Sequence, residues 1–251
     1  MRLIGLTMVM TICALTACVT EYSGPTPPNT NVSTALEQRV ALARQYIGAG
    51  DWENAKRNLV LARQIDADNA EVYEAFALVY QSTGEFELAQ DNFEKALRLA
   101  PDLSRARNNY AAFLYGRGDF TEAEKEWIRV TQDTLYSGRP LAFINLGLVR
   151  LQLKDSTGAE AAFARALSMD RRNPLALLEL AHLRLDAGDT QAARQYYDVY
   201  RTVVVPQSPR GFALGIRLAQ KTADADAEGS YRLALRNLYP NSPEARALSD
   251  N

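Results

Sequence analysis

The chain has 251 residues and a formal charge of -2 at pH 7, from 28 basic and 30 acidic side chains. Apolar residues make up 47 %, enough to bury a continuous core, and the balanced, interspersed charge excludes the basic surface of a nucleic-acid-binding protein. The two cysteines, Cys13 and Cys18, both lie near the start, which excludes a disulfide framework in the body of the chain.

The start of the chain, before Cys18, has the pattern of a bacterial secretory signal. Arg2 precedes an apolar stretch from Leu3 to Leu15, which is too short to span a bilayer. The run Leu-Thr-Ala-Cys that ends at Cys18 resembles the lipobox of bacterial lipoproteins, which are cut before the cysteine and acylated on it. We therefore expect a cleaved signal peptide over residues 1–17 and a lipid anchor, including palmitate, at Cys18. The alternative is an ordinary cleaved signal that leaves a spare thiol.

The residues after the anchor carry two further expectations. Val19 follows the cysteine and no aspartate does, so resemblance to Gram-negative lipoproteins implies an outer-membrane location with the body in the periplasm. Residues 18–33 are dominated by Pro, Gly, Ser, Thr and Asn, which cannot bury a core. They predict a lipidated cysteine followed by a flexible tether.

A regular spacing of alanines organises the rest of the chain. Each alanine has an aromatic residue or leucine four positions later, and all steps between successive alanines are equal except one, which is slightly longer. A period of about 34 residues with this pattern is the signature of the tetratricopeptide repeat, a helix–turn–helix unit. The series consists of Ala55, Ala89, Ala123, Ala159, Ala193 and Ala227.

The period predicts an all-α fold, a right-handed superhelical solenoid of six tetratricopeptide repeats within residues 34–240. A C-terminal tail follows at 241–251. Gly-acidic pairs mark most of the turns within units, and Pro101, Pro174 and Pro240 mark helix ends. The expected units are about 36–69, 70–103, 104–139, 140–173, 174–207 and 208–241. The expected helix pairs are 34–49 and 52–66, 70–83 and 86–99, 104–117 and 120–133, 140–154 and 157–169, 174–187 and 190–202, and 208–221 and 224–238.

One connection departs from the period. The segment from Thr131 to Pro140 is longer than its counterparts, which accounts for the single longer step from Ala123 to Ala159. Surface loops accept added length at small cost, so a tolerated insertion is one interpretation. The other is a contact patch that presents Leu135, Tyr136 and Arg139.

The sequence offers no catalytic constellation. His182 is the only histidine, no cysteine follows Cys18, and there is no Gly-rich phosphate loop. We therefore expect a binding protein and no enzyme, with no metal, no cofactor, no small-molecule substrate and no nucleic acid as ligand.

Tetratricopeptide arrays usually bind partners on the concave face, made by the first helix of each unit. Family groove positions map onto a polar first half, with Glu37, Arg44, Glu71, Glu74, Arg105 and Asn108, and a more apolar second half. Ordinary packing between units accounts for part of the apolar row, and the remainder would form an exposed patch. The candidate groove consists of Asn109, Leu141, Ile144, Asn145, Leu148, Leu151, Leu175, Leu178, His182, Phe212 and Ile216.

The outer flank of the first unit is an alternative partner surface. The first helix of an array has no preceding neighbour, so its apolar side is expected to remain partly open. The residues that would form this surface are Leu36, Val40, Ile47, Trp52 and Leu59.

The lipobox, the tether and the six units together resemble the PilF/PilW family of type IV pilus biogenesis lipoproteins. The segment from Asn108 to Leu148 carries most of the resemblance, with further support from Ala193–Tyr200 and Leu214–Ala219. The resemblance implies an outer-membrane pilotin that binds secretin subunits and promotes their localisation and assembly into multimers. The alternative is a scaffold lipoprotein of another outer-membrane system, serving barrel assembly or recruiting cell-wall hydrolases.

Overall fold

The computed structural model describes residues 30–248, which form thirteen helices and no strand. This confirms the all-α repeat fold. The signal peptide, Cys18 and the first part of the tether lie outside the described residues. The helices are α1 (Thr30–Ala49), α2 (Trp52–Ile65), α3 (Ala70–Thr83), α4 (Phe86–Leu99), α5 (Ser104–Arg117), α6 (Phe120–Gln132), α7 (Arg139–Gln152), α8 (Ser156–Met169), α9 (Pro174–Asp186), α10 (Thr190–Val203), α11 (Pro209–Lys221), α12 (Ala225–Leu238) and α13 (Pro243–Ala247).

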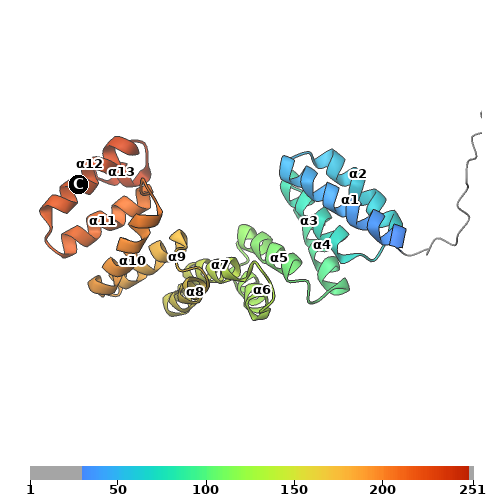
Figure 1. The fold of residues 1–251 in the computed structure, drawn as a ribbon, viewed down its shortest axis with the longest axis horizontal. Helices are drawn as coiled ribbons and strands as arrows, with labels where there is room; N and C mark the ends of the chain where they lie inside the picture. The colour runs from blue at the N-terminus through green and yellow to red at the C-terminus, as the bar shows by residue number, and fades with distance from the viewer. Residues whose placement is uncertain (1–29, 249–251) are drawn as a thin grey trace, which may run out of the picture.

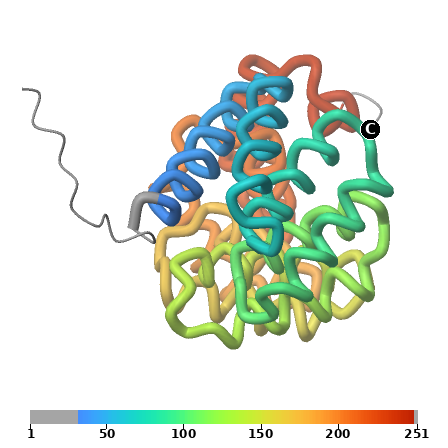
Figure 2. Tube along the Cα trace, turned by 90° about the vertical axis from the view of Figure 1, so that its right-hand side faces the viewer, coloured from blue at the N-terminus to red at the C-terminus, as the bar shows by residue number. Residues whose placement is uncertain are grey.

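The first twelve helices pack as six antiparallel pairs that follow one another along an arch (Figure 1). In the middle of the arch, α5, α7 and α9 lie on its inner side, and α6, α8 and α10 lie on its outer side (Figure 1). Turned by 90°, the first unit (blue) and the last unit (red) lie in the upper part of the view, above the green and yellow middle units (Figure 2). Each pair therefore contacts mainly its neighbours, as expected of a solenoid.

Small residues at the eighth position of the units let the paired helices approach closely. Ala77, Ala111 and Ala181 are completely buried. At Gly147 a Cβ atom would lie 2.6 Å from the ring of Phe163, which is itself completely buried. A larger residue there would overlap the next helix, so glycine is required for this packing.

The turns inside the units share a left-handed residue at the end of the first helix. Gly50, Gly84, Gly118 and Gly188 have φ between 73° and 88°. Glycine adopts this conformation without the steric penalty of a Cβ atom. Lys154 takes the same place in unit four with φ 63°, and Ala223 in unit six with φ 54°. Four of the six turns thus have the residue that the geometry favours, and two do not.

Most expected helix bounds agree with the structure within two residues, and two regions differ by more. Helix α1 begins at Thr30, so residues 30–33, assigned to the tether, are helical; Ser33 Oγ donates to Glu37 Oε1 at 3.0 Å one turn later. Polar residues are compatible with a first helical turn because its N–H groups have no helical acceptor. The segment called a tail contains α13, capped by Ser242 and packed through the buried Ala245. The repeat period gave no signal for so short a helix.

Candidate functional site

Four of the predicted groove residues are buried in the core. Ile144 packs with Phe163 and Leu180, and the other three pack among the helices of units five and six. Their exposed fractions are 2 % for Ile144, 5 % for Leu178, 6 % for Phe212 and 4 % for Ile216. The expectation that they face a partner is therefore wrong, because adjacent helix pairs close over these positions.

The remaining apolar groove residues reach the surface to different degrees. Leu141, in the first turn of α7, is 56 % exposed, whereas the others are half-buried. Leu141, Asn145 and Leu148 are spaced i, i+4 and i+7, so they share one face of α7. The half-buried set consists of Leu148, Leu151 and Leu175, which pack partly against the core around Phe163.

The polar residues of the first half bind one another across three units. Glu74 of α3 is completely buried and pairs with Arg44 of α1. It also accepts a hydrogen bond of 2.6 Å from Nδ2 of Asn109 in α5. Arg105 of α5 lies 2.9 Å from Glu71 and 3.8 Å from Glu74. These side chains therefore brace α1, α3 and α5 together, and the Asn109 amide expected to contact a partner is already bonded.

A second brace joins α9 to α11. Arg210 donates to both carboxylate oxygens of Glu179 at 2.7 and 3.2 Å, and Glu179 is 4 % exposed. Further along the same two helices, Arg217 lies 2.5 Å from Asp186. The Glu179 contact is responsible for raising the pKa of Arg210 above its ordinary value, chiefly through the hydrogen bond. The sequence analysis did not predict these pairs between buried carboxylates and arginines of other units. The available signal was opposite charges at groove positions one or two units apart.

His182 lies between these two ion pairs. Burial lowers the pKa of His182, and the nearby charge of Arg210 lowers it further. Its Nε2 atom is buried and has no hydrogen-bond partner among residues 30–248. Both effects favour the neutral form of the ring, and no described group near it forms a catalytic pair with it.

The alternative partner surface is largely part of the core. Leu59 is completely buried and Val40 is 5 % exposed, so the expectation of an open flank is wrong for both. Leu36, Ile47 and Trp52 are half-buried around the same cluster. The physical reason is that α3 of the second unit packs on α1 and α2 and covers this side.

A cleft of about 440 Å³ lies beside α1, between unit one and the next two units. Leu36 and Val40 form its apolar wall, and Arg44 and Arg105 reach it from α1 and α5. The alternative partner surface thus meets the polar groove positions of the first half at this place. The two guanidinium groups are neutralised by the glutamates of the brace, so the cleft has no strong net charge.

The longer connection before α7 is held in a fixed shape. Ser104 Oγ donates to Asp133 at 2.6 Å, and the other Asp133 oxygen accepts from the Leu135 backbone at 3.0 Å. Arg139 Nε donates to the carbonyl of Thr131 at 2.7 Å. Tyr136 packs on the core, whereas Leu135 is 94 % exposed. Of the three residues expected in a contact patch, Leu135 alone projects fully.

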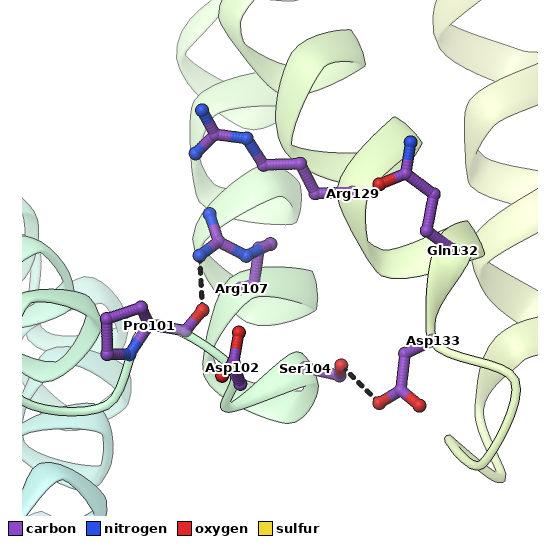
Figure 3. Close-up of a pocket in the computed structure, with 7 residues that line it drawn as sticks. All are labelled: Pro101, Asp102, Ser104, Arg107, Arg129, Gln132 and Asp133. Carbon is purple, nitrogen blue, oxygen red and sulfur yellow. Dashed lines mark hydrogen bonds between the residues drawn. The ribbon is translucent and has the colours of Figure 1, made fainter.

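Figure 3 shows a polar cleft of about 540 Å³ between the turn after α4 and the end of α6. Arg107 donates to the carbonyl of Pro101, and Ser104 donates to Asp133 at the other side (Figure 3). Arg107 also pairs with Glu126. The bonds to Glu126 and Asp133 hold α5 against α6 and the turn after it within unit three, and the bond to Pro101 ties α5 to the preceding turn. Within residues 30–248, no three His, Cys, Asp or Glu side chains are placed to hold a metal ion.

The helices of the described part are also unsuited to crossing a bilayer. None between residues 30 and 248 combines the required length with sufficient apolar character.

Comparison with known proteins places this architecture in a family. A sequence model of the tetratricopeptide repeat matches residues 74–140 and 144–209. The type IV pilus assembly protein PilF of Pseudomonas aeruginosa is 37 % identical over 231 residues, covering 92 % of this chain and 91 % of PilF.

Two solved structures agree with this. A structure of Pseudomonas aeruginosa PilF matches with a TM-score of 0.81 and 36 % identity, covering 88 % of this chain and 99 % of that one. The crystal structure of PilW, described as a widely conserved type IV pilus biogenesis factor, matches with a TM-score of 0.72 and 27 % identity. That match covers 85 % of this chain and 97 % of PilW. The chain therefore belongs to the PilF/PilW family of tetratricopeptide-repeat proteins, which act in type IV pilus biogenesis.

Proposed function

We propose that this protein is a pilotin, an outer-membrane lipoprotein that binds secretin subunits and promotes their localisation and assembly into multimers. The observation that carries the proposal is the 37 % identity to a type IV pilus assembly protein along nearly the whole of both chains. A solenoid of helix pairs supports it, because such arrays present extended surfaces to other polypeptides and need no catalytic groups.

The anchor is the second part of the proposal. Acyl chains on Cys18 hold the protein in the inner leaflet of the outer membrane, so that the repeats face the periplasm. Several chains together give a durable anchor, at about 0.8 kcal/mol per buried methylene, where one chain binds only reversibly. The lipobox that ends at Cys18 supports this step.

The deciding experiment is deletion of the gene in its source organism, followed by gel analysis of secretin multimers and by a piliation assay. The expected result is loss of multimers and pili, with both restored by the wild-type gene. Normal multimers and pili in the deletion strain would refute the pilotin role. In that event a scaffold of barrel assembly or of cell-wall hydrolases becomes the better assignment.

A Cys18→Ala variant tests the anchor separately. We expect the variant protein to fractionate with soluble periplasmic proteins and the secretin to be misplaced. A matched Cys13→Ala variant, altered within the segment expected to be removed, should remain in the membrane fraction. If Cys18→Ala stays in outer membranes of a strain that also lacks the secretin, the anchor is not at this cysteine.

A further inference from the structure

Hydrogen bonds and ion pairs join the inner faces of neighbouring odd-numbered helices near both ends of the array, but not in the middle. Glu74 binds Asn109 between α3 and α5, and Glu179 binds Arg210 between α9 and α11. Within residues 30–248, no hydrogen bond or ion pair joins α7 to α5 or to α9. Helix α7 is bonded instead to the neighbouring outer helices, notably through Arg150, which binds Glu124 of α6 and the Gly158 carbonyl of α8.

This unbonded region has a distinct chemical character. It consists of Leu141, Asn145 and Leu148 of α7 with Leu175 of α9, which we call the α7 inner face. At the same repeat position as Leu141 and Leu175, units one to three carry Glu37, Glu71 and Arg105. The α7 inner face therefore has no charged side chain, while leucine at its first position is 56 % exposed.

Charged side chains on the neighbouring inner faces are already paired within the chain. Arg105 on the α5 side pairs with Glu71 at 2.9 Å. On the α9 side, Arg210 pairs with Glu179 at 2.7 Å. A charged partner segment would find these charges already paired, and covering its own charge with leucine side chains would be unfavourable. The surface is complementary to an uncharged, apolar segment.

Asn145 favours an extended over a helical conformation of such a segment. Its side-chain amide is half-buried and has no hydrogen-bond partner among the described residues, unlike Asn109 at the same position of the preceding unit. The side-chain amide of Asn145 can both donate and accept hydrogen bonds. A partner that covers it removes its hydrogen bonds to water, and this loss is unfavourable unless the partner replaces them. A helical segment has its backbone groups bonded internally, whereas an extended segment offers free N–H and C=O groups.

We propose that the α7 inner face binds an extended, uncharged, apolar segment of a partner polypeptide. Apolar side chains of the segment pack on Leu141, Leu148 and Leu175, and one of its peptide groups bonds to the amide of Asn145. The inference rests on the proposed function in one respect: within the pilotin role, the segment belongs to the secretin.

The test uses the full chain and two peptide probes. One is a phage library of random short peptides, and the other is a set of overlapping peptides that tile the periplasmic and membrane regions of the secretin. The strongest peptide is then measured by fluorescence anisotropy against the wild type, Leu141→Glu, Leu141→Gln and Asn145→Leu. Leu233→Glu serves as the matched control, because Leu233 lies on α12 and is similarly exposed at 62 %. Circular dichroism confirms that each variant is folded.

The expected binders contain a run without Asp, Glu, Lys or Arg. Leu141→Glu should weaken binding by about a hundredfold and Leu141→Gln by about tenfold, where each factor of ten corresponds to about 1.4 kcal/mol. Leu233→Glu should bind as the wild type does. Replacing single peptide amides of the ligand by esters should weaken binding to the wild type at one position. The same ester should have no effect on Asn145→Leu, because the bond it removes is absent there.

Several results would overturn the inference. They are the absence of any binder from both probes, binders with charged centres, or equal binding by Leu141→Glu and Leu233→Glu. An ester scan with no sensitive position would exclude the extended conformation. These outcomes are separate from failure of the pilotin role, which is judged from secretin multimers in the deletion strain and does not depend on where the partner binds.

Discussion

The side-chain amide of Asn109 donates a hydrogen bond of 2.6 Å to the carboxylate of Glu74, although 35 positions separate the two residues in the chain. Glu74 is completely buried and is also paired with Arg44, so one carboxylate bonds to side chains of α1 and α5. This arrangement sets the position of the first three units relative to one another. It also gives the first prediction.

Replacing Glu74 by alanine leaves two guanidinium groups and an amide without their shared acceptor. Removing one partner of a buried ion pair costs about 3–5 kcal/mol, and we expect about 3 kcal/mol because both arginines keep some access to water. Urea unfolding followed by circular dichroism measures the change. The control is Asp91→Ala, since Asp91 is exposed in α4 and its side chain forms no bond within residues 30–248; its effect should stay within about 0.5 kcal/mol. Equal effects of the two variants would contradict the buried pairing.

The close approach of α7 and α8 gives a second prediction. A Cβ atom added at Gly147 would lie 2.6 Å from the ring of Phe163, which is completely buried. Gly147→Ala should therefore lower the free energy of unfolding by about 1–3 kcal/mol. Gly229→Ala is the matched control, because Gly229 is also helical but has no atom within 4 Å of the added carbon. It should raise stability by about 0.5–1 kcal/mol through helix propensity.

The rescue variant sharpens this test. Combining Gly147→Ala with Phe163→Leu removes the ring atoms that the new carbon would meet. The double variant should then lose less stability than the sum of the two single changes. Strict additivity would show that the two residues do not compete for the same space.

The turn of unit four gives a third prediction. Lys154 has φ 63°, in the left-handed region, whereas Gly118 occupies the equivalent place in unit three with φ 88°. A residue with a Cβ atom costs roughly 1–2 kcal/mol in this conformation. Lys154→Gly should accordingly raise the free energy of unfolding by about 1 kcal/mol, and Gly118→Ala should lower it by a similar amount. Differential scanning calorimetry would detect melting shifts of opposite sign, and shifts of the same sign would refute the argument.

Ionisation of a half-buried tyrosine gives a fourth prediction. Burial, reinforced by the charge of Glu94, raises the pKa of Tyr110 to about 12, above the ordinary value near 10. The unfolded chain therefore releases this proton first as the pH rises. The contribution of Tyr110 to stability is complete below pH 10 and is lost between about pH 10 and 12.

Urea unfolding of the wild type and of Tyr110→Phe at pH 7 and pH 11 tests whether stability falls with rising pH because of this group. The variant should lose less stability than the wild type between the two values of pH, because phenylalanine has no proton to release. The measurement at pH 7 isolates the change in packing and in the hydrogen bond to Glu94. An identical loss in both proteins would contradict the raised pKa.

The candidate site could be predicted only in part. Leu141 is exposed and Asn145 half-buried on one face of α7, a placement that the spacing of the repeats gives through local helical geometry, whereas their contact with a partner stays a prediction. The spacing could not separate Ile144 from Leu141, because burial at that position depends on how the next helix pair packs. Nor could it show that the Asn109 amide already donates a hydrogen bond within the chain, since the acceptor lies in another unit.

The sequence alone determined the twelve paired helices, their pairing and the turns. These follow from the regular repeat period, from apolar spacing within each helix and from glycine at left-handed positions, all of which act over short distances along the chain. Tertiary structure decided the rest. The buried bonds of Glu74 and Glu179, the covering of Val40 and Leu59, and the uncharged face left open on α7 depend on contacts between units. Such contacts are set by the curvature of the whole array, to which many weak packing interactions contribute and which no single repeat encodes.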